Sequence, residues 1–222
     1  MSSAVIQLLV LAGIAIFLIL RLRSVLGSRE GFEKPQVPMG GATDQARAPR
    51  REFEVIEGGV DRDITDHVDD GTEAAKALAA MKIAEPGFHV GEFLQGARQA
   101  YEMILMAFEQ GDMEEVKAFI ADDVYEAFAE VVAAREAQGL TVEANFVGVR
   151  EVTLTDATFD RDTSTGEVTV RFVGELTYVV RDAQGEVVEG DPNSIKRQKD
   201  VWSFAREMGS GDPNWQLVAT GE

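Results

Sequence analysis

The sequence predicts an α+β fold, carried on an N-terminal transmembrane helix, in which helices precede a run of antiparallel strands. Three observations predict it. An apolar run without charge stands near the start of the 222-residue chain, apolar residues then recur with the period of a helix, and beyond Leu140 that period falls to two. Helices that come before the strands, rather than alternating with them, are typical of an α+β domain.

The first segment has the composition of a membrane span. Residues 4–20 are apolar apart from Gln7, and no charge occurs before Arg21. At about 1.5 Å per residue the run covers roughly 26 Å, near the short end of what crosses the hydrocarbon core of a bilayer. We therefore expect residues 1–26 to be a membrane anchor. Residues expected within the span include Ala4, Leu8, Leu11, Phe17 and Leu20.

Basic residues follow the apolar run and none precedes it. Arg21, Arg23, Arg29 and Lys34 lie on its C-terminal side. The positive-inside rule therefore predicts a single-pass protein with its C-terminal domain in the cytoplasm. A cleaved signal peptide would show the reverse order of charge. Arg21, Arg23 and Arg29 are the expected basic flank, where contact with anionic lipid adds to the anchor.

Proline and glycine recur through residues 27–70 and interrupt any helix or strand there. We therefore predict a flexible linker over residues 27–70. It contains one short apolar patch, Phe53-Glu54-Val55-Ile56, which is either a docking segment or an incidental cluster. Residues 71–85 then predict a short helix that begins at Thr72 as its N-cap.

Three further helices are expected before the strands. The longest ends at Gly111 and carries apolar residues at helical spacing. Asp112 with Glu115 resembles a capping box that opens a second, short helix, and Asp123 with Glu126 resembles one that opens a third. The stripe of the long helix consists of Phe93, Ala97, Tyr101, Ile104 and Phe108.

Alternation of apolar and polar residues predicts a sheet with one buried face. The clearest strand covers residues 167–181 and places Phe172, Leu176 and Tyr178 on the same side. Such a sheet would wrap the long helix and give, over residues 86–222, a cystatin-like cone of the nuclear-transport-factor-two-like type. The companion strands are expected at residues 142–147, 149–159, 186–189, 194–206 and 215–220.

Charge and composition exclude several classes of function. Residues 1–51 carry seven lysines and arginines against three acidic residues, and the rest of the chain carries 14 against 36, a net charge of −22. A domain this acidic repels phosphate backbones, so no nucleic-acid partner is expected. The chain has no cysteine, and His67 and His89 lie far apart in sequence, so we expect no metal site and no cofactor.

Motifs that would indicate catalysis are missing from the sequence. It contains no glycine-rich phosphate loop, serine elbow or paired metal-ligand motif. Tyr101 and Tyr178 are candidate proton-transfer groups, but no charged residue shares the strand face of Tyr178 between Val168 and Val180. A tyrosine without an acid or base beside it is better interpreted as part of the core, so we predict that the protein is not an enzyme.

Several motifs make this sequence resemble the Tim44-like domain family of mitochondrial inner-membrane translocase subunits, and within it the membrane-anchored alphaproteobacterial adaptors of the TimA type. The resemblance covers residues 75–222. Early motifs are Phe88 with Phe93 and the pair Gly111-Asp112, followed later by Gly190-Asp191-Pro192. The most distinctive are Asp200-Val201-Trp202-Ser203-Phe204-Ala205-Arg206 and Asp212-Pro213-Asn214-Trp215-Gln216-Leu217.

The resemblance implies an adaptor that binds proteins at the bacterial inner membrane, in translocation, assembly or quality control. Expected partners are inner-membrane lipid, through the N-terminal helix, and translocase, chaperone, protease or membrane-protein clients. Arg206 is expected to form a surface ion pair with Asp200 or Asp212. The resemblance also implies a hydrophobic pocket. Its candidate lining residues are Phe93, Tyr101, Phe108, Phe172, Tyr178, Trp202, Phe204 and Trp215.

Two other functions remain open at this point. A cone of this kind also suits a domain that binds or converts a small apolar ligand in its pocket. A buried aspartate or glutamate at the pocket floor would favour that function. The second is a ribosome-associated membrane tether, which the acidic charge of the domain disfavours.

Overall fold

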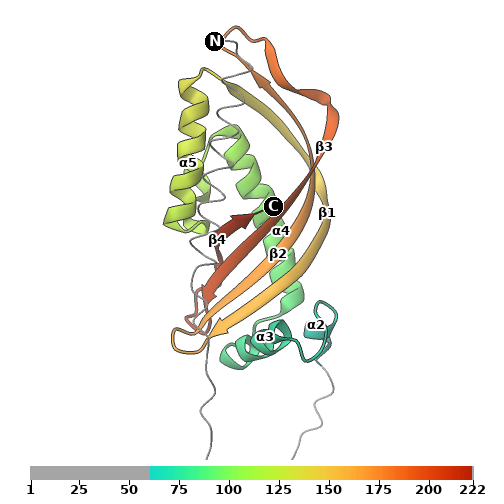
Figure 1. The fold of residues 1–222 in the computed structure, drawn as a ribbon. Coiled ribbons are helices and arrows are strands. Elements are labelled where there is room, and N and C mark those ends of the chain that lie inside the picture. Colours follow the sequence, from blue (N-terminus) through green and yellow to red (C-terminus); the bar gives the residue numbers. More distant parts are fainter. Residues whose placement is uncertain (1–60, 222) are drawn as a thin grey trace, which may run out of the picture. The chain divides into compact units, whose positions relative to one another are not determined.

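The computed structural model describes residues 61–221. Helices precede strands, so the predicted α+β class is confirmed for this part of the chain (Figure 1). The predicted membrane anchor lies outside the described residues, and among the helices within them none is long and apolar enough to cross a membrane. In chain order the elements are α2 (Arg62–Thr65), α3 (Glu73–Ala84), α4 (Val90–Gln110), the 3₁₀ helix η1 (Glu114–Phe119), α5 (Asp122–Ala137), β1 (Thr141–Asp160), β2 (Thr165–Arg181), β3 (Val187–Glu207) and β4 (Gln216–Gly221).

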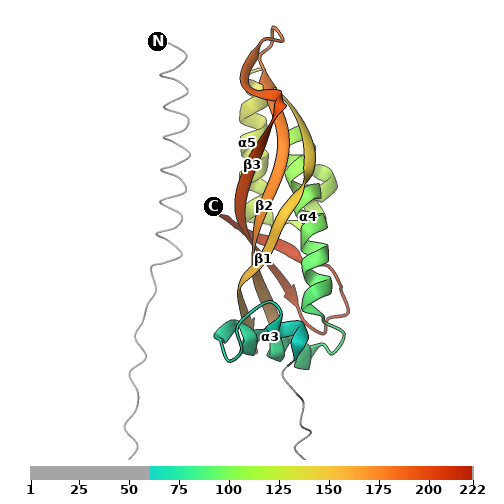
Figure 2. The same cartoon turned by 90° about the vertical axis from the view of Figure 1, so that its right-hand side faces the viewer.

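The four strands form one antiparallel sheet in the order β1-β2-β3-β4. The sheet curves around α4, and α5 lies on the same side of it (Figures 1 and 2). Long antiparallel strands joined by tight turns coil in this way because each strand twists, and the twist accumulates along a long ribbon. The curved sheet and the long helix that it wraps together position the candidate site.

Two predicted strand breaks are absent. The strands expected at residues 142–147 and 149–159 form the single strand β1, whose pairing with β2 shifts register between Phe146 and Gly148. The strands expected at residues 186–189 and 194–206 form the single strand β3. In each case a bulge replaces the predicted break, because glycine and proline can interrupt a ladder of hydrogen bonds without ending the strand.

Aromatic rings fill the space between α4 and the sheet. The side chain of Tyr101 on α4 is fully buried and stacks on Phe172 of β2, with ring centroids 4.5 Å apart and an interplanar angle of 11°. Trp202 of β3 lies against the same tyrosine at 4.8 Å. Buried aromatic pairs contribute beyond the area that they remove from water, so this cluster holds α4 to the sheet.

The helices α2 and α3 close one end of the sheet. α3 begins at Thr72, whose hydroxyl accepts a hydrogen bond from the Ala75 backbone N–H, as its predicted N-cap role requires. Met81 of α3 packs so closely on Gly166 of β2 that a Cβ there would lie 3.0 Å from the Met81 sulfur. α2 falls within residues 27–70, for which the sequence predicts a linker, so the folded domain starts earlier than residue 71.

The two predicted capping boxes do not form. η1 has Met113 as its N-cap and α5 has Ala121, and neither makes a side-chain capping hydrogen bond. The Asp123 carboxylate instead accepts a hydrogen bond from the adjacent Val124 N–H. A short capping motif in the sequence therefore locates the start of a helix only to within a residue or two.

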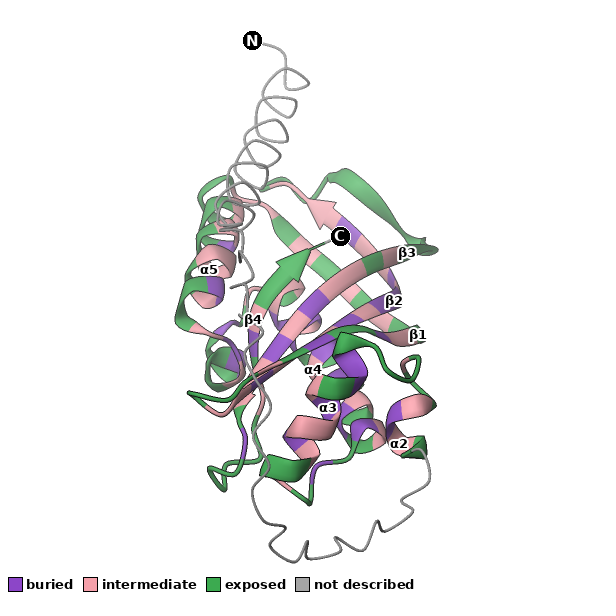
Figure 3. Cartoon of the chain, turned by 60° about the horizontal axis from the view of Figure 1, so that its bottom comes forward, coloured by how far each residue is buried: buried purple, intermediate pink, exposed green. Residues whose placement is uncertain are grey.

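Burial divides β3 into two halves. Between Trp202 and Arg206 buried and half-buried residues follow one another, whereas residues 187–197 are all exposed (Figure 3). The change coincides with the extent of β4, which pairs with β3 only from Val201 to Ala205.

Candidate functional site

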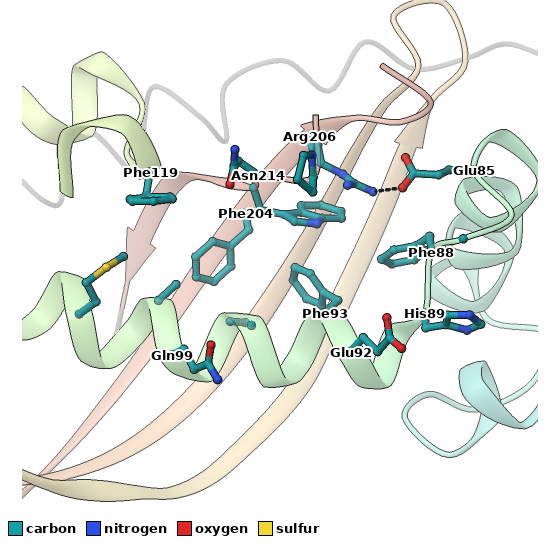
Figure 4. Close-up of a pocket in the computed structure, with 17 residues that line it drawn as sticks. Glu85, Phe88, His89, Glu92, Phe93, Gln99, Phe119, Phe204, Arg206 and Asn214 are labelled. Atoms are coloured by element: carbon teal, nitrogen blue, oxygen red, sulfur yellow. Dashed lines mark hydrogen bonds and ion pairs between the residues drawn. The ribbon is translucent and has the colours of Figure 1, made fainter. Parts of the chain in front are cut away.

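A groove of about 540 Å³ opens between α4, the end of β3 and the segment that leads into β4. Five aromatic residues line it, and four of them have rings in mutual contact and form its floor: Phe88, Phe93, Phe204 and Trp215. The fifth is Phe119. Figure 4 shows the labelled rings of Phe88, Phe93 and Phe204 turned toward the same hollow. Grooves of this volume, mostly apolar with a few polar groups at the edge, are typical binding sites.

Elements far apart in sequence supply the floor. Phe88 stands just before α4 and Phe93 lies in its first turns, while Phe204 comes from β3. The Trp215 ring lies 4.6 Å from Phe93 and 5.8 Å from Phe88, measured between ring centroids. Because these rings also pack on one another, the floor is formed before any partner arrives.

Small residues on α4 leave the hollow open. Gly96, Ala97 and Ala100 line the groove, at the helical spacing that places them on the same face as Phe93. A Cβ built on Gly96 would meet no other atom within 4 Å. The groove therefore exists because side-chain volume is missing from one helix face.

An ion pair closes one rim of the groove. The Arg206 guanidinium donates from Nη2 to Glu85 Oε1 at 2.7 Å, and Gly209 N–H donates to Glu85 Oε2 at 2.9 Å. Arg206 also lies over the Trp215 ring, 5.0 Å from its centroid. The Gly209 hydrogen bond and, after it, Arg206 lower the pKa of Glu85 against the opposing effect of burial.

This ion pair corrects the partner predicted for Arg206. The expected carboxylates were those of Asp200 and Asp212, but Arg206 pairs with Glu85, and Asp212 contributes only its backbone carbonyl, 3.2 Å from Nη1. The curved sheet brings the end of β3 to the loop before α4, so a partner 121 residues away is nearer than the acids beside it in sequence.

Asp63 ties α2 to the start of α4, at the end of the groove. Its carboxylate accepts hydrogen bonds from the backbone N–H groups of Val90 and Gly91, at 2.9 and 3.1 Å, and from Lys82 Nζ at 2.9 Å. Burial alone would raise the pKa of Asp63, but these hydrogen bonds outweigh it and lower the pKa to about 2. A carboxylate at these free N–H groups is the charge that a helix N-terminus favours.

A buried tyrosine and a carboxylate meet behind the groove. The Tyr101 hydroxyl donates to Asp200 Oδ2 at 2.6 Å, and Gln198 Nε2 donates to Oδ1 of the same carboxylate at 3.1 Å. The interpretation that no acid lies beside Tyr101 is therefore wrong, because the acid comes from β3 rather than from the face of β2. Burial and then Asp200 raise the pKa of Tyr101, which leaves it a hydrogen-bond donor and a poor base.

Tyr178 has an acidic neighbour as well. Its hydroxyl donates to Glu189 Oε1 at 2.7 Å, and Lys196 Nζ lies 4.5 Å from the centre of its ring. The hydrogen bond to Glu189, followed by burial, raises the pKa of Tyr178 to about 12. Both partners come from β3, so the strand face of β2 alone does not reveal them.

The structure brings together three of the eight candidate pocket residues in the groove: Phe93, Phe204 and Trp215. Three others, Tyr101, Phe172 and Trp202, are buried in the core between α4 and the sheet. The remaining two lie elsewhere, as Phe108 packs on Phe128 of α5 at 4.9 Å and Tyr178 lies near Glu189.

Sequence reasoning missed the rim and part of the floor. Phe88, Met103, Glu85 and Arg206 line the groove without having been predicted to do so. The stripe of small residues on α4 is the signal that points to the groove, because a core-facing helix face otherwise carries large apolar side chains. No sequence signal predicts the pairing of Glu85 with Arg206.

The membrane-related candidates lie outside the described residues. They comprise the span residues Ala4, Leu8, Leu11, Phe17 and Leu20, the flanking Arg21, Arg23 and Arg29, and the apolar patch Phe53-Glu54-Val55-Ile56. Within residues 61–221 no group of three or more histidine, aspartate or glutamate side chains is placed to hold a metal ion.

Comparison with known proteins matches residues 74–222 to the model of the Tim44-like domain. The human mitochondrial import inner membrane translocase subunit TIM44 is 27% identical over 151 residues, which cover 66% of this chain and 33% of the relative. Subunit TIM44-1 of Arabidopsis thaliana is 22% identical over 152 residues, which cover 66% and 32%. The chain thus matches about a third of the length of these relatives.

One solved structure, the intermembrane space region of chloroplast protein ARC6, aligns with 59% of this chain and 92% of its own. The TM-score is 0.38 and the sequence identity is 12%, so the similarity is distant.

Proposed function

This chain belongs to the Tim44-like domain family, and on that premise we propose that it is a membrane-anchored, non-enzymatic adaptor whose groove binds protein partners at the bacterial inner membrane. The observation that carries the proposal is the groove itself, an open hollow with a preformed aromatic floor. Apolar side chains of a partner would bury their surface against these rings, which is the main source of affinity in protein interfaces.

Two acid–base candidates, Glu85 at the rim and Tyr101 behind the groove, have structural roles. Glu85 is held by Arg206 and Gly209, and the Tyr101–Asp200 pair lies in the core, outside the residues that line the groove. The Glu85 carboxylate is thus committed to structural hydrogen bonds, and a tyrosine whose pKa is raised does not act as a base near neutral pH.

The membrane part of the proposal rests on the sequence. We propose that residues 1–26 anchor the chain in the inner membrane, in the manner of the TimA type, with the folded domain on the cytoplasmic side. A flexible tether formed by residues 27–60 would have a root-mean-square length of roughly 30 Å and so keep the domain near the bilayer. Confinement of this kind raises the effective concentration of the groove for translocase, chaperone, protease or membrane-protein clients.

A photo-crosslinking side chain at Met103 tests the groove. Met103 lines it and is 39% exposed, whereas Val147 is 50% exposed on β1 and serves as the control position. In membranes from cells that produce the full chain, we expect Met103 to cross-link discrete protein partners that Val147 does not reach.

A matched pair of variants at Gly96 makes the test specific. Gly96→Leu fills the open space beside the helix and should abolish the cross-links from Met103, whereas Gly96→Ala leaves that space and should keep them. Cross-links that survive Gly96→Leu would contradict binding in the groove. A small molecule recovered from the groove, with no protein cross-linked, would favour the small-ligand function instead.

Protease treatment of spheroplasts and inverted vesicles tests the membrane topology. We expect the folded domain to be cut only in inverted vesicles, where the cytoplasmic face is accessible. Cleavage in spheroplasts would overturn the proposed orientation and leave binding by the groove intact.

A further inference from the structure

The outer edge of β3 is open over its first half. β4 pairs with β3 only from Val201 to Ala205, so within residues 61–221 the stretch 187–200 has no strand on its outer side. The opposite edge of the sheet is protected, because α3 and α4 pack against β1 and Arg98 donates a hydrogen bond to the Val149 carbonyl. An open edge presents free backbone donors and acceptors to another strand.

Apolar side chains gather on this edge. Of the six large hydrophobic residues that are exposed in the described part of the chain, three belong to β3: Val187 at 49%, Val188 at 50% and Ile195 at 57%. A group of large apolar side chains that is exposed along an unpaired edge indicates a contact surface.

Charge along the edge is separated into two blocks. Glu186, Glu189 and Asp191 make the first block acidic, and Lys196, Arg197 and Lys199 make the second basic. A second copy laid antiparallel would place the acidic block of each chain beside the basic block of the other. A parallel arrangement would place like charges together.

A bulge separates the two blocks. Asp191 pairs with Tyr178 of β2 and Lys196 pairs with Leu176, so residues 192–195 form an excursion between neighbouring pairs. Pro192 lacks a backbone N–H, which limits strand pairing to the segments on either side of the bulge. Because Tyr178 and Leu176 share one face of β2, Asp191 and Lys196 point to the same face and can meet across a two-fold axis.

We propose that this edge is a self-association surface, on which residues 187–191 of one copy pair with residues 196–200 of a second copy, and the reverse. The two bulges lie at the axis. The contact is isologous, so it closes into a dimer. It is also weak, since the interface is small and each domain carries a strong negative charge.

Covalent trapping suits a weak contact, and the natural chain contains no cysteine that would interfere. Ser194 is exposed within the bulge, and Thr158 is exposed on β1 at the other edge of the sheet. In the full chain in its membranes, mild oxidation should convert Ser194→Cys to a disulfide-linked dimer, while Thr158→Cys stays monomeric. Equal dimer yields from the two variants would overturn the proposal, as would trapping of Ser194→Cys on a different protein.

Charge reversal tests the antiparallel pairing. In the Ser194→Cys chain, Lys196→Glu should lower the dimer yield roughly tenfold, because two acidic groups then face each other on both sides of the axis. Asp191→Lys should do the same, and the double variant should restore the yield because it exchanges the two charges. A dimer that resists both single reversals, or a double variant that stays monomeric, would refute this pairing. Cross-links from the groove at Met103 do not depend on either outcome.

Discussion

The two halves of β3 belong to one strand and have opposite surroundings. Between Val201 and Ala205 the strand lies between β2 and β4 with α4 beneath it, and Trp202 and Phe204 are buried in alternation with half-buried Ser203. Between residues 187 and 197 it has β2 on one side only and every residue is exposed. Strand conformation therefore does not confer burial, which depends on the neighbours that the fold supplies.

The largest expected effect comes from removing an aromatic ring in the half of β3 that pairs with β4. Phe204 is 2% exposed and contacts the rings of Phe93, Phe172 and Trp202. Phe204→Ala should lower the free energy of unfolding by about 3–5 kcal/mol, since it opens a cavity in a packed cluster. Urea unfolding followed by circular dichroism measures the change.

The matched variant in the open half is Val188→Ala, which should change the free energy of unfolding by less than about 0.5 kcal/mol. If Phe204→Ala and Val188→Ala lowered the free energy of unfolding by similar amounts, residues 187–197 would be covered in solution. The two halves of β3 would then not differ in their surroundings.

A smaller effect is expected at Gly190, inside the open half. Gly190 has a φ of +82°, and a Cβ there would lie 2.3 Å from the Tyr178 carbonyl oxygen. Gly190→Ala should lower the free energy of unfolding by about 3 kcal/mol, the sum of left-handed strain and this clash.

Gly185 separates these two contributions. Its φ of +83° is almost the same, but a Cβ there would meet nothing within 4 Å. Gly185→Ala should therefore lower the free energy of unfolding by only about 1 kcal/mol. If Gly190→Ala and Gly185→Ala lowered the free energy of unfolding equally, the backbone at Gly190 would shift away from the Tyr178 carbonyl at no cost.

The smallest effect concerns Asp63 and depends on pH. Its pKa of about 2 lies below the ordinary value of 3.8, so its stabilising contribution is complete above about pH 4 and is lost as pH falls through 2. Asp63→Asn should lower the free energy of unfolding by about 1 kcal/mol at pH 7, after allowance for solvent screening. The difference from the unmodified chain should shrink between pH 4 and pH 2.

Asp70→Asn is the control for this measurement, because Asp70 is exposed in the same N-terminal stretch. It should leave the free energy of unfolding within about 0.5 kcal/mol at every pH. A loss at Asp63 that stays constant down to pH 2 would show that the carboxylate charge does not hold α2 to α4.

Local periodicity predicted the elements whose surroundings are uniform. The stripe from Phe93 to Phe108 predicted α4, and the alternation from Val168 onward predicted β2, because each element buries one face along most of its length. The same reasoning failed at Gly148 and at the bulge after Gly190. There the adjoining strand β2 keeps the chain extended although glycine and proline suggest a break.

Contacts between distant residues explain what the sequence does not reveal about the site. Tyr101 and Asp200 are 99 residues apart, and Arg206 and Glu85 are 121 apart. Neither pair follows a local spacing rule, since the curvature of the sheet brings its members together. The sequence also failed to predict α2, because the contacts that hold this helix are distant. The Asp63 carboxylate accepts hydrogen bonds from Val90 and Gly91, 27 and 28 residues further along the chain.

The open space beside Gly96 has a consequence for the evolution of such domains. Because the depth of the groove is set by three small residues on one helix, a single substitution there would change which side chains fit, while the sheet and its aromatic cluster stay as they are. Under the proposed function, one larger side chain on this helix face is enough to change which partner binds.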